Sequence, residues 1–150
     1  MSQTAYSLTT AAALAGMKAD AQFDYVESHP AQAAIGFGLG VVRHAAGDNR
    51  VRLPAGADTA ASLMGIALHE QKESLVGYLI YDSVNVLRRG IAWVLVNDTV
   101  ADGDDVFVVN AVADFGKFRN DNTNAIALAS AKFRSAAVSG GIAKVEINLP

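Results

Sequence analysis

The sequence predicts an all-β domain, a compact antiparallel sandwich or barrel with an extended N-terminal arm. Short apolar segments alternate with turn-forming residues about every ten positions from residue 23 onward, a spacing typical of sandwiches and barrels. No segment shows the apolar repeat of a long amphipathic helix. We therefore expect an arm over residues 1–22 and a single β domain over residues 23–150.

The predicted arm is poor in large apolar side chains and rich in Ala, Ser and Thr. Its alanines favour a short helix near Thr10–Ala15, but an isolated helix of this length is marginal in water. The arm must therefore pack on its own domain or on a partner. Its sizeable hydrophobic residues, which we take as the candidate contact residues, are Tyr6, Leu8, Leu14 and Met17.

Several segments of the domain have the pattern of strands. Polar and apolar residues alternate in Arg50–Leu53, Lys132–Arg134 and Ile142–Leu149, as expected when one face is buried. Ile91–Val96 and Val106–Val109 are instead apolar on both faces. Either such a strand is covered on both sides within the domain, or another subunit covers its second face. In the last strand, the predicted buried face consists of Ala143, Val145, Ile147 and Leu149.

Glycine and aspartate positions predict the local connections. Arg88–Gly90 reads as a hairpin turn between Val84–Leu87 and Ile91–Val96. The turn Asp102–Asp105 then leads into a third strand, so the three strands would form a meander or part of a jelly roll. Glycines alternate with large residues in Gly36–Gly40, which predicts a strand that another backbone or an aromatic ring approaches closely.

No catalytic, metal or cofactor motif stands out in the chain. His29, His44 and His69 form no metal-binding pair, and no Gly-x-Ser-x-Gly elbow is present. The glycines of Gly36–Gly40 fit neither phosphate-loop pattern, and Asp102–Asp105 lacks the spacing of an EF-hand. The chain has no cysteine, which excludes disulfides and thiolate zinc sites. We expect a protein that is not an enzyme and needs no cofactor.

Charge and hydropathy narrow the possible partners. The net charge is −3 and Arg88-Arg89 is the only adjacent basic pair, so nucleic acid is not an expected partner. No apolar run approaches the ~18–20 residues of a membrane helix, and the N-terminus lacks the basic region of a secretory signal. We therefore expect no membrane partner.

Several segments form a pattern through their order and spacing over residues 16–149. The most distinctive lies in the middle of the chain, where Val84–Val94 reads Val-x-Val-Leu-x-x-Gly-x-x-Trp-Val. The other segments are Gly16–Asp20, Asp24–Ser28, Ala34–Arg43, Gly65–Leu68, Gly103–Val106 and Gly141–Ile147. Taken together, these segments resemble the capsid decoration proteins of tailed bacteriophages, also called structural cement proteins.

The resemblance implies a jelly-roll-like virion structural protein on the outer capsid surface, made in the host cytoplasm. Its partners would be the major capsid protein, whose subunits it would bridge, and other copies of itself, as dimers or trimers at capsid symmetry axes. The family has no catalytic residues to carry over. Under this hypothesis, Tyr6, Leu8, Leu14 and Met17 order on a capsid subunit or on a neighbouring copy.

A stand-alone carbohydrate-binding β module is the main alternative. Such a module needs exposed aromatic side chains on one face, and the candidates are Tyr78, Tyr81 and Trp93. Trp93 lies in the most apolar segment, so we expect it to be buried, which disfavours this alternative. An enzyme remains a third hypothesis and would require a deep pocket with convergent polar groups.

Overall fold

The computed structural model describes residues 13–20, 23–72 and 76–150, and the regular secondary structure of these residues is almost entirely β, as predicted. The one helical element in these ranges is the 3-10 turn η1 (Ala60–Ser62). No helix in the described ranges is long and apolar enough to cross a membrane. The strands are β1 (Tyr25–Pro30), β2 (Ile35–Gly36), β3 (Gly40–Arg43), β4 (Val51–Arg52), β5 (Leu63–Ala67), β6 (Gly77–Tyr78), β7 (Ser83–Leu95), β8 (Asp105–Val109), β9 (Phe118–Arg119), β10 (Ala125–Phe133) and β11 (Ile142–Asn148).

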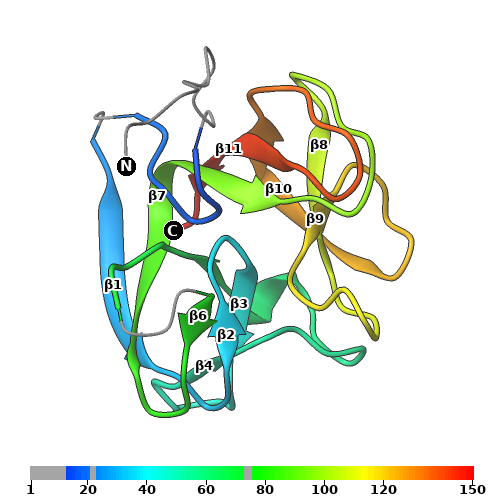
Figure 1. Cartoon of the computed structure of the whole chain (residues 1–150). Helices are drawn as coiled ribbons and strands as arrows, with labels where there is room; N and C mark the ends of the chain where they lie inside the picture. The colour runs from blue at the N-terminus through cyan, green and yellow to red at the C-terminus, as the bar shows by residue number, and fades with distance from the viewer. Residues whose placement is uncertain (1–12, 21–22, 73–75) are drawn as a thin grey trace, which may run out of the picture.

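Nine of these strands form one curled antiparallel sheet (Figure 1). Its order is β4-β3-β5-β7-β11-β10-β8-β9, with β1 paired to β7 outside this path, and β2 and β6 form a separate ribbon. The two ends of the path approach each other, because Gly40 N–H donates to Gly116 O at 2.7 Å. Val96 also forms a parallel bridge with Phe118. The sheet therefore curls toward a barrel.

β7 is a single bent strand, so the predicted hairpin at Arg88–Gly90 is wrong. Gly90 has a φ of 131°, and a Cβ at this position would lie 3.1 Å from the Cβ of Asp24. Glycine here allows the strand to bend and Asp24 to come close, rather than reversing the chain. Register places β1 opposite 83–89 of β7 and β11 opposite 89–95.

The predicted meander is also wrong, because β8 does not pair with β7. β8 pairs with β10 on one side and β9 on the other. The glycine-rich segment Gly36–Gly40 is not one strand, since β2 ends at Gly36 and β3 begins at Gly40. Its predicted close contacts are present: a Cβ on Gly40 would lie 3.3 Å from the Phe118 ring, and one on Gly38 would lie 2.8 Å from Gly16 N.

The C-terminal strand has the predicted alternation. The four residues expected to face the core, Ala143, Val145, Ile147 and Leu149, are all buried. In the second half of β7, one face is fully buried and the other is half-buried; the half-buried residues are Ile91, Trp93 and Leu95. The chain itself therefore covers part of this second face.

The apolar interior has two clusters. The larger one lies under β7, β8, β10 and β11 and includes Phe118 and Phe133, both fully buried. The smaller one includes Ile35, Val84 and Tyr78. The Tyr78 hydroxyl donates to Leu68 O at 2.8 Å, which satisfies its one polar group inside this cluster.

Residues Gly16–Ala19 are hydrogen-bonded to β7. Gly16 N–H donates to Trp93 O at 2.7 Å, Trp93 N–H to Met17 O at 2.9 Å, and Ala19 N–H to Ile91 O at 2.8 Å. Gly16 itself has a φ of 82° and no room for a Cβ, which would lie 2.6 Å from His69 N. We call this segment the arm root. The boundary of the arm at residue 22 stays a prediction, and most of the predicted helix near Thr10–Ala15 lies outside the described residues.

Candidate protein-contact surface

The largest group of exposed hydrophobic side chains lies in one short stretch of sequence. Of eleven such residues in the described ranges, five fall between residues 14 and 26. Phe23 is 85% exposed, and the others are between 37% and 54% exposed. We call these five residues the contact strip: Leu14, Met17, Phe23, Tyr25 and Val26. Exposed apolar side chains beyond a scattered few mark a candidate protein-contact site.

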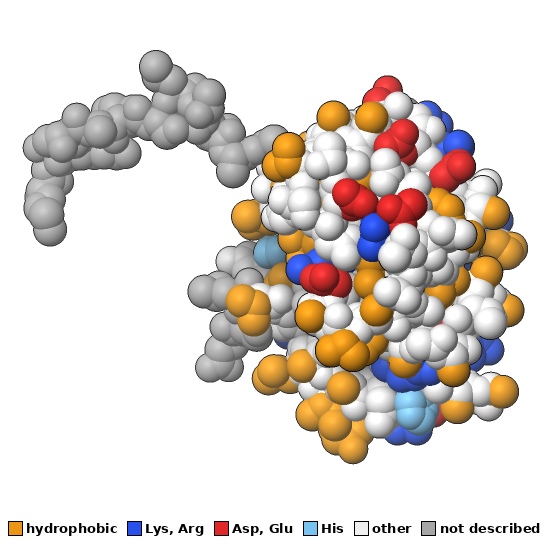
Figure 2. All heavy atoms as spheres, turned by 90° about the vertical axis from the view of Figure 1, so that its right-hand side faces the viewer, with side chains coloured by type: hydrophobic (Ala, Val, Ile, Leu, Met, Phe, Trp, Pro, Cys, Tyr) orange, Lys and Arg blue, Asp and Glu red, His pale blue; other side chains and the backbone are white. Residues whose placement is uncertain are grey.

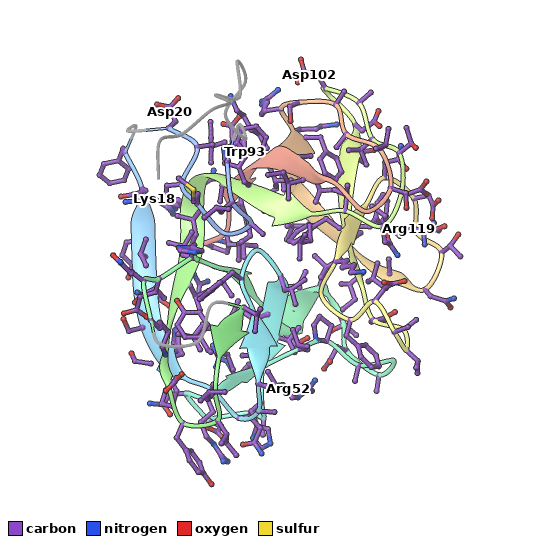
Figure 3. The ribbon with its side chains drawn as sticks, viewed as in Figure 1. Lys18, Asp20, Arg52, Trp93, Asp102 and Arg119 are labelled. Atoms are coloured by element: carbon purple, nitrogen blue, oxygen red, sulfur yellow. The ribbon has the colours of Figure 1, made fainter. Side chains whose placement is uncertain are left out.

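The contact strip begins at the arm root and continues into β1. Met17 N–H donates to Leu14 O at 3.1 Å, which forms the turn that presents both side chains. Lys18 Nζ then contacts Asp24 Oδ2 at 2.6 Å, so the arm root is tied to the start of β1. Figure 3 shows Lys18, Asp20 and Trp93 in the upper part of the molecule, where the arm root reaches the bend of β7.

A shallow hollow of about 370 Å³ lies beside the β1 part of the strip. Phe23 and Tyr25 supply apolar walls, and two arginine side chains supply donors. One of them, Arg89, donates from Nε to Leu149 O at 3.3 Å. The lining residues are Phe23, Tyr25, Glu27, Arg88, Arg89, Leu149 and Pro150. The hollow has the size and composition to receive a side chain of a partner.

Glu27 is the one acidic residue of β1, and its carboxylate has three partners. It accepts from the Tyr25 hydroxyl at 3.0 Å and contacts His29 Nε2 at 3.1 Å and Arg88 Nη1 at 3.3 Å. Burial raises the pKa of Glu27, but the bonds from His29, Tyr25 and Arg88 outweigh it and lower that pKa overall. The same bond to Glu27 raises the pKa of Tyr25. The partners of the Glu27 carboxylate therefore all belong to β1 and β7.

A second apolar surface is the turn between β6 and β7. Leu79, Ile80 and Tyr81 are consecutive and exposed, and Val76 is exposed nearby. Tyr81 has a φ of 68°, a strained value for a non-glycine residue. The Asp82 carboxylate accepts from Leu79 N–H at 2.7 Å and pairs with Lys72, which fixes the turn.

The side that carries β8 and β9 has acidic side chains, several of them paired with basic ones. Figure 2 shows acidic side chains gathered in the upper half of this face and hydrophobic ones toward its lower edge. Arg119 bridges Asp98 at 3.1 Å and Asp121 at 2.9 Å, and Lys132 pairs with Asp105 at 2.5 Å. No group of three or more acidic or histidine side chains in the described ranges has the geometry of a metal site.

Stability should decrease at low pH because of Asp121. Its carboxylate accepts from the Thr123 backbone N–H and from Arg119, which lower its pKa from 3.8 to about 2. A pKa that is lower in the folded state stabilises the fold above the unfolded value and is lost as the pH falls through the folded value. We therefore expect the free energy of unfolding to decrease between about pH 4 and pH 2.

Urea unfolding at pH 7, 4, 3 and 2 measures this effect. Asp121→Asn should show a smaller decrease than the natural chain, and Asp102→Asn, in an exposed turn nearby, serves as the matched control. Equal pH dependence in the natural chain and Asp121→Asn contradicts the assignment.

The structure describes two of the four predicted contact residues. Leu14 and Met17 are exposed and adjacent, while Tyr6 and Leu8 lie outside the described residues. Their role in contacts stays a prediction. Phe23, Tyr25 and Val26 were not among the predicted contact residues. The available signal in the sequence was the pair of aromatic residues, Phe23 and Tyr25, near the start of the first strand.

The three aromatic residues predicted as candidates for carbohydrate binding do not share an exposed face. Tyr78 is buried, and Tyr81 is 73% exposed in the β6–β7 turn. Trp93 was predicted to be buried but is half-buried, with Lys144 Nζ 5.2 Å from its ring centroid. The sequence could not show this, because Lys144 reaches Trp93 only through the pairing of β7 with β11.

Comparison with known proteins identifies a family and a solved structure of the same fold. The family model described as structural cement protein (E217 gp24/Pam3 gp6) matches residues 1–148. A chain from a solved structure entitled "The capsid of Myoviridae Phage XM1" shares the fold with a TM-score of 0.77 and 22% identity, over 97% of this chain and 96% of that chain. Among curated proteins, none matches the chain.

Proposed function

The chain belongs to the structural cement protein family of phages, and we propose that it bridges neighbouring major capsid protein subunits on the outer surface of the shell. A member of this family is a structural protein of the virion that decorates the capsid. We infer that it acts by binding, without catalysis, and that it occupies capsid symmetry axes as a dimer or trimer. Neither nucleic acid nor membrane is a partner in this proposal.

The observation that carries the proposal is the contact strip at the arm root. Leu14 and Met17 remain exposed where the arm joins the domain, although the backbone around them is hydrogen-bonded to β7 and His69. Tyr6 and Leu8 precede them in the sequence, so the apolar residues of the arm and of the strip form a series along the chain. A fixed root with apolar residues on both sides suits a segment that packs on another subunit.

Repetition gives such contacts their effect on the shell. A single interface of modest area can be weak, because affinity depends on a few well-packed residues more than on area. A cement protein that contacts two capsid subunits at once raises the effective concentration of each contact. Separation of the subunits then requires several contacts to break together.

Co-sedimentation with expanded capsids that lack the protein tests the proposal. We expect saturable binding, with a copy number per shell that is fixed by capsid symmetry. Heating the decorated and bare shells then measures cementing, and decorated shells should lose integrity at a higher temperature. Binding that does not saturate, or no binding to any capsid form, contradicts the proposal.

The double variant Leu14→Ser/Met17→Ser should bind capsids at least tenfold more weakly. Each side chain would be partly buried against the capsid. The loss of ~1 kcal/mol or more of binding free energy at each position accounts for this factor. The fold should be unaffected, because both side chains are exposed. A truncation of residues 2–12, which leaves every described contact in place, should weaken binding further if Tyr6 and Leu8 contribute.

The matched control is Val112→Ser/Val138→Ser, since these side chains are 84% and 70% exposed and lie outside the strip. Equal binding of both double variants and the natural chain would remove Leu14 and Met17 from the contact.

A further inference from the structure

We propose that β1 is a docking edge for a second copy of this chain, whose own β1 adds antiparallel across a two-fold axis and joins the two sheets. The proposal deepens the proposed function and rests on it in one respect, because the capsid brings neighbouring copies together. The contact itself involves only this chain and can be tested with the soluble protein.

β1 lies at the edge of the sheet. Register pairs its six residues with β7 along one side, and no described strand pairs along the other. Figure 1 shows β1 as the outermost strand on the left of the molecule. The register shift at Tyr25/Val26 places the extra residue, Arg88, on β7, so β1 itself advances without interruption. An open, regular edge is a template for another strand.

Protection of this edge by charge is weak, and proline stands only at its last position, Pro30. Edge strands commonly carry charged side chains that oppose pairing with a second edge. β1 has one carboxylate, that of Glu27, and it is already bonded to Tyr25, His29 and Arg88 within the chain. Phe23, Tyr25 and Val26 are exposed instead. The edge therefore presents apolar side chains next to open backbone groups.

Antiparallel pairing of β1 with itself is self-complementary, as a two-fold interface requires. Centred on Val26, the pairing sets the two Val26 residues opposite each other. Tyr25 of each copy then lies opposite Glu27 of the other, and both side chains are on the same face, since they share a hydrogen bond within one copy. A register centred on Glu27 would oppose two carboxylates and is disfavoured.

The exposed area indicates a weak contact. At ~200 Å² for an aromatic side chain, the exposed fractions of Phe23 and Tyr25 correspond to about 270 Å² per copy. Even with Val26 and the strand backbone added, two copies fall short of the ~1,200–2,000 Å² of a stable complex. We therefore expect a dimer that forms at high concentration in solution and is completed when the capsid holds two copies side by side.

Cysteine cross-linking is a direct test, because the chain has no cysteine of its own. Directly opposed residues of an antiparallel pair have Cα atoms ~4.5–5.5 Å apart, within the range that a disulfide spans. Val26→Cys should give a disulfide-linked dimer under mild oxidation. Ser28→Cys tests the register and should not link, and Ser130→Cys, exposed on β10, measures the background.

Each outcome decides part of the proposal. Faster linking of Val26→Cys than of Ser130→Cys supports the docking edge, and linking at Ser28 instead overturns the Val26 register. Linking of all three variants at the background rate, both in solution and on capsids, overturns the proposal. If the natural chain still saturates capsids in that last case, capsid decoration stands and only the β1 contact fails.

A charge variant gives an independent readout. Val26→Lys places two ammonium groups opposite each other, and we expect at least a tenfold weaker dimer by analytical ultracentrifugation. Ser130→Lys is the matched control. Unchanged self-association of Val26→Lys overturns the proposal, and its circular dichroism spectrum establishes that the variant is folded.

Discussion

Replacing Gly65 with alanine is expected to lower the free energy of unfolding by about 3 kcal/mol, through backbone strain and overpacking together. Gly65 lies in β5 with a φ of 145°, and a Cβ there would lie 2.2 Å from Leu87 O and 2.9 Å from a methyl group of Val86. β5 would have to separate from β7, which joins the two halves of the sheet. Thermal and urea unfolding measure the loss.

Gly56→Ala is the control for Gly65→Ala. A Cβ on Gly56 meets nothing within 4 Å, so this variant should keep the natural stability or gain slightly from the reduced entropy of the unfolded chain. Similar melting temperatures for the two variants would falsify the close approach of β5 and β7.

Phe118→Ala is expected to lower the free energy of unfolding by about 3–5 kcal/mol, as is usual for truncation of a buried phenylalanine. Phe118 is fully buried in β9, where it pairs with Val108 and bridges to Val96. Its ring packs against Gly40, at the place where the ends of the curled sheet meet. The cavity should therefore weaken closure of the sheet as well as packing.

Two measurements distinguish these effects. Urea unfolding gives the loss of stability, and hydrogen exchange should show faster exchange of Gly40 N–H, which bonds to Gly116 O. The control is Phe23→Ala, whose side chain is 85% exposed and should change stability by no more than ~0.5 kcal/mol. Retention of natural stability by Phe118→Ala would contradict the core described here.

The sequence was most informative where polar and apolar residues alternate along a strand. Burial in Ile142–Leu149 follows residue by residue from its pattern, because a strand with one buried face records that face in every second residue. The all-β class followed from the spacing of turns. The motifs of the middle segment also identified the family, although the local structure inferred for that segment was a hairpin.

Errors arose where a residue's role depends on distant segments. Gly90 looks like a turn residue, but it serves the bend of β7 and the approach of Asp24. Tyr78 was a candidate exposed aromatic residue for carbohydrate binding, but it is buried and its hydroxyl donates to Leu68 O inside the core. Phe23, Tyr25 and Val26 are exposed because β1 lies at the edge of the sheet, and strand order is a property of long-range pairing. Local patterns do not contain that information.

The attachment of the arm root to β7 has a mechanical consequence. Residues Gly16–Ala19 and β1 follow the same direction along β7, with Lys18 opposite Ala92 and Pro30 opposite Ser83. A tension applied at Ala13 along this direction loads the interstrand hydrogen bonds in shear, so that several must rupture at once. The same tension applied across the strands would open them one at a time. A pull along β7 is thus resisted by the hydrogen bonds of the root together rather than one after another.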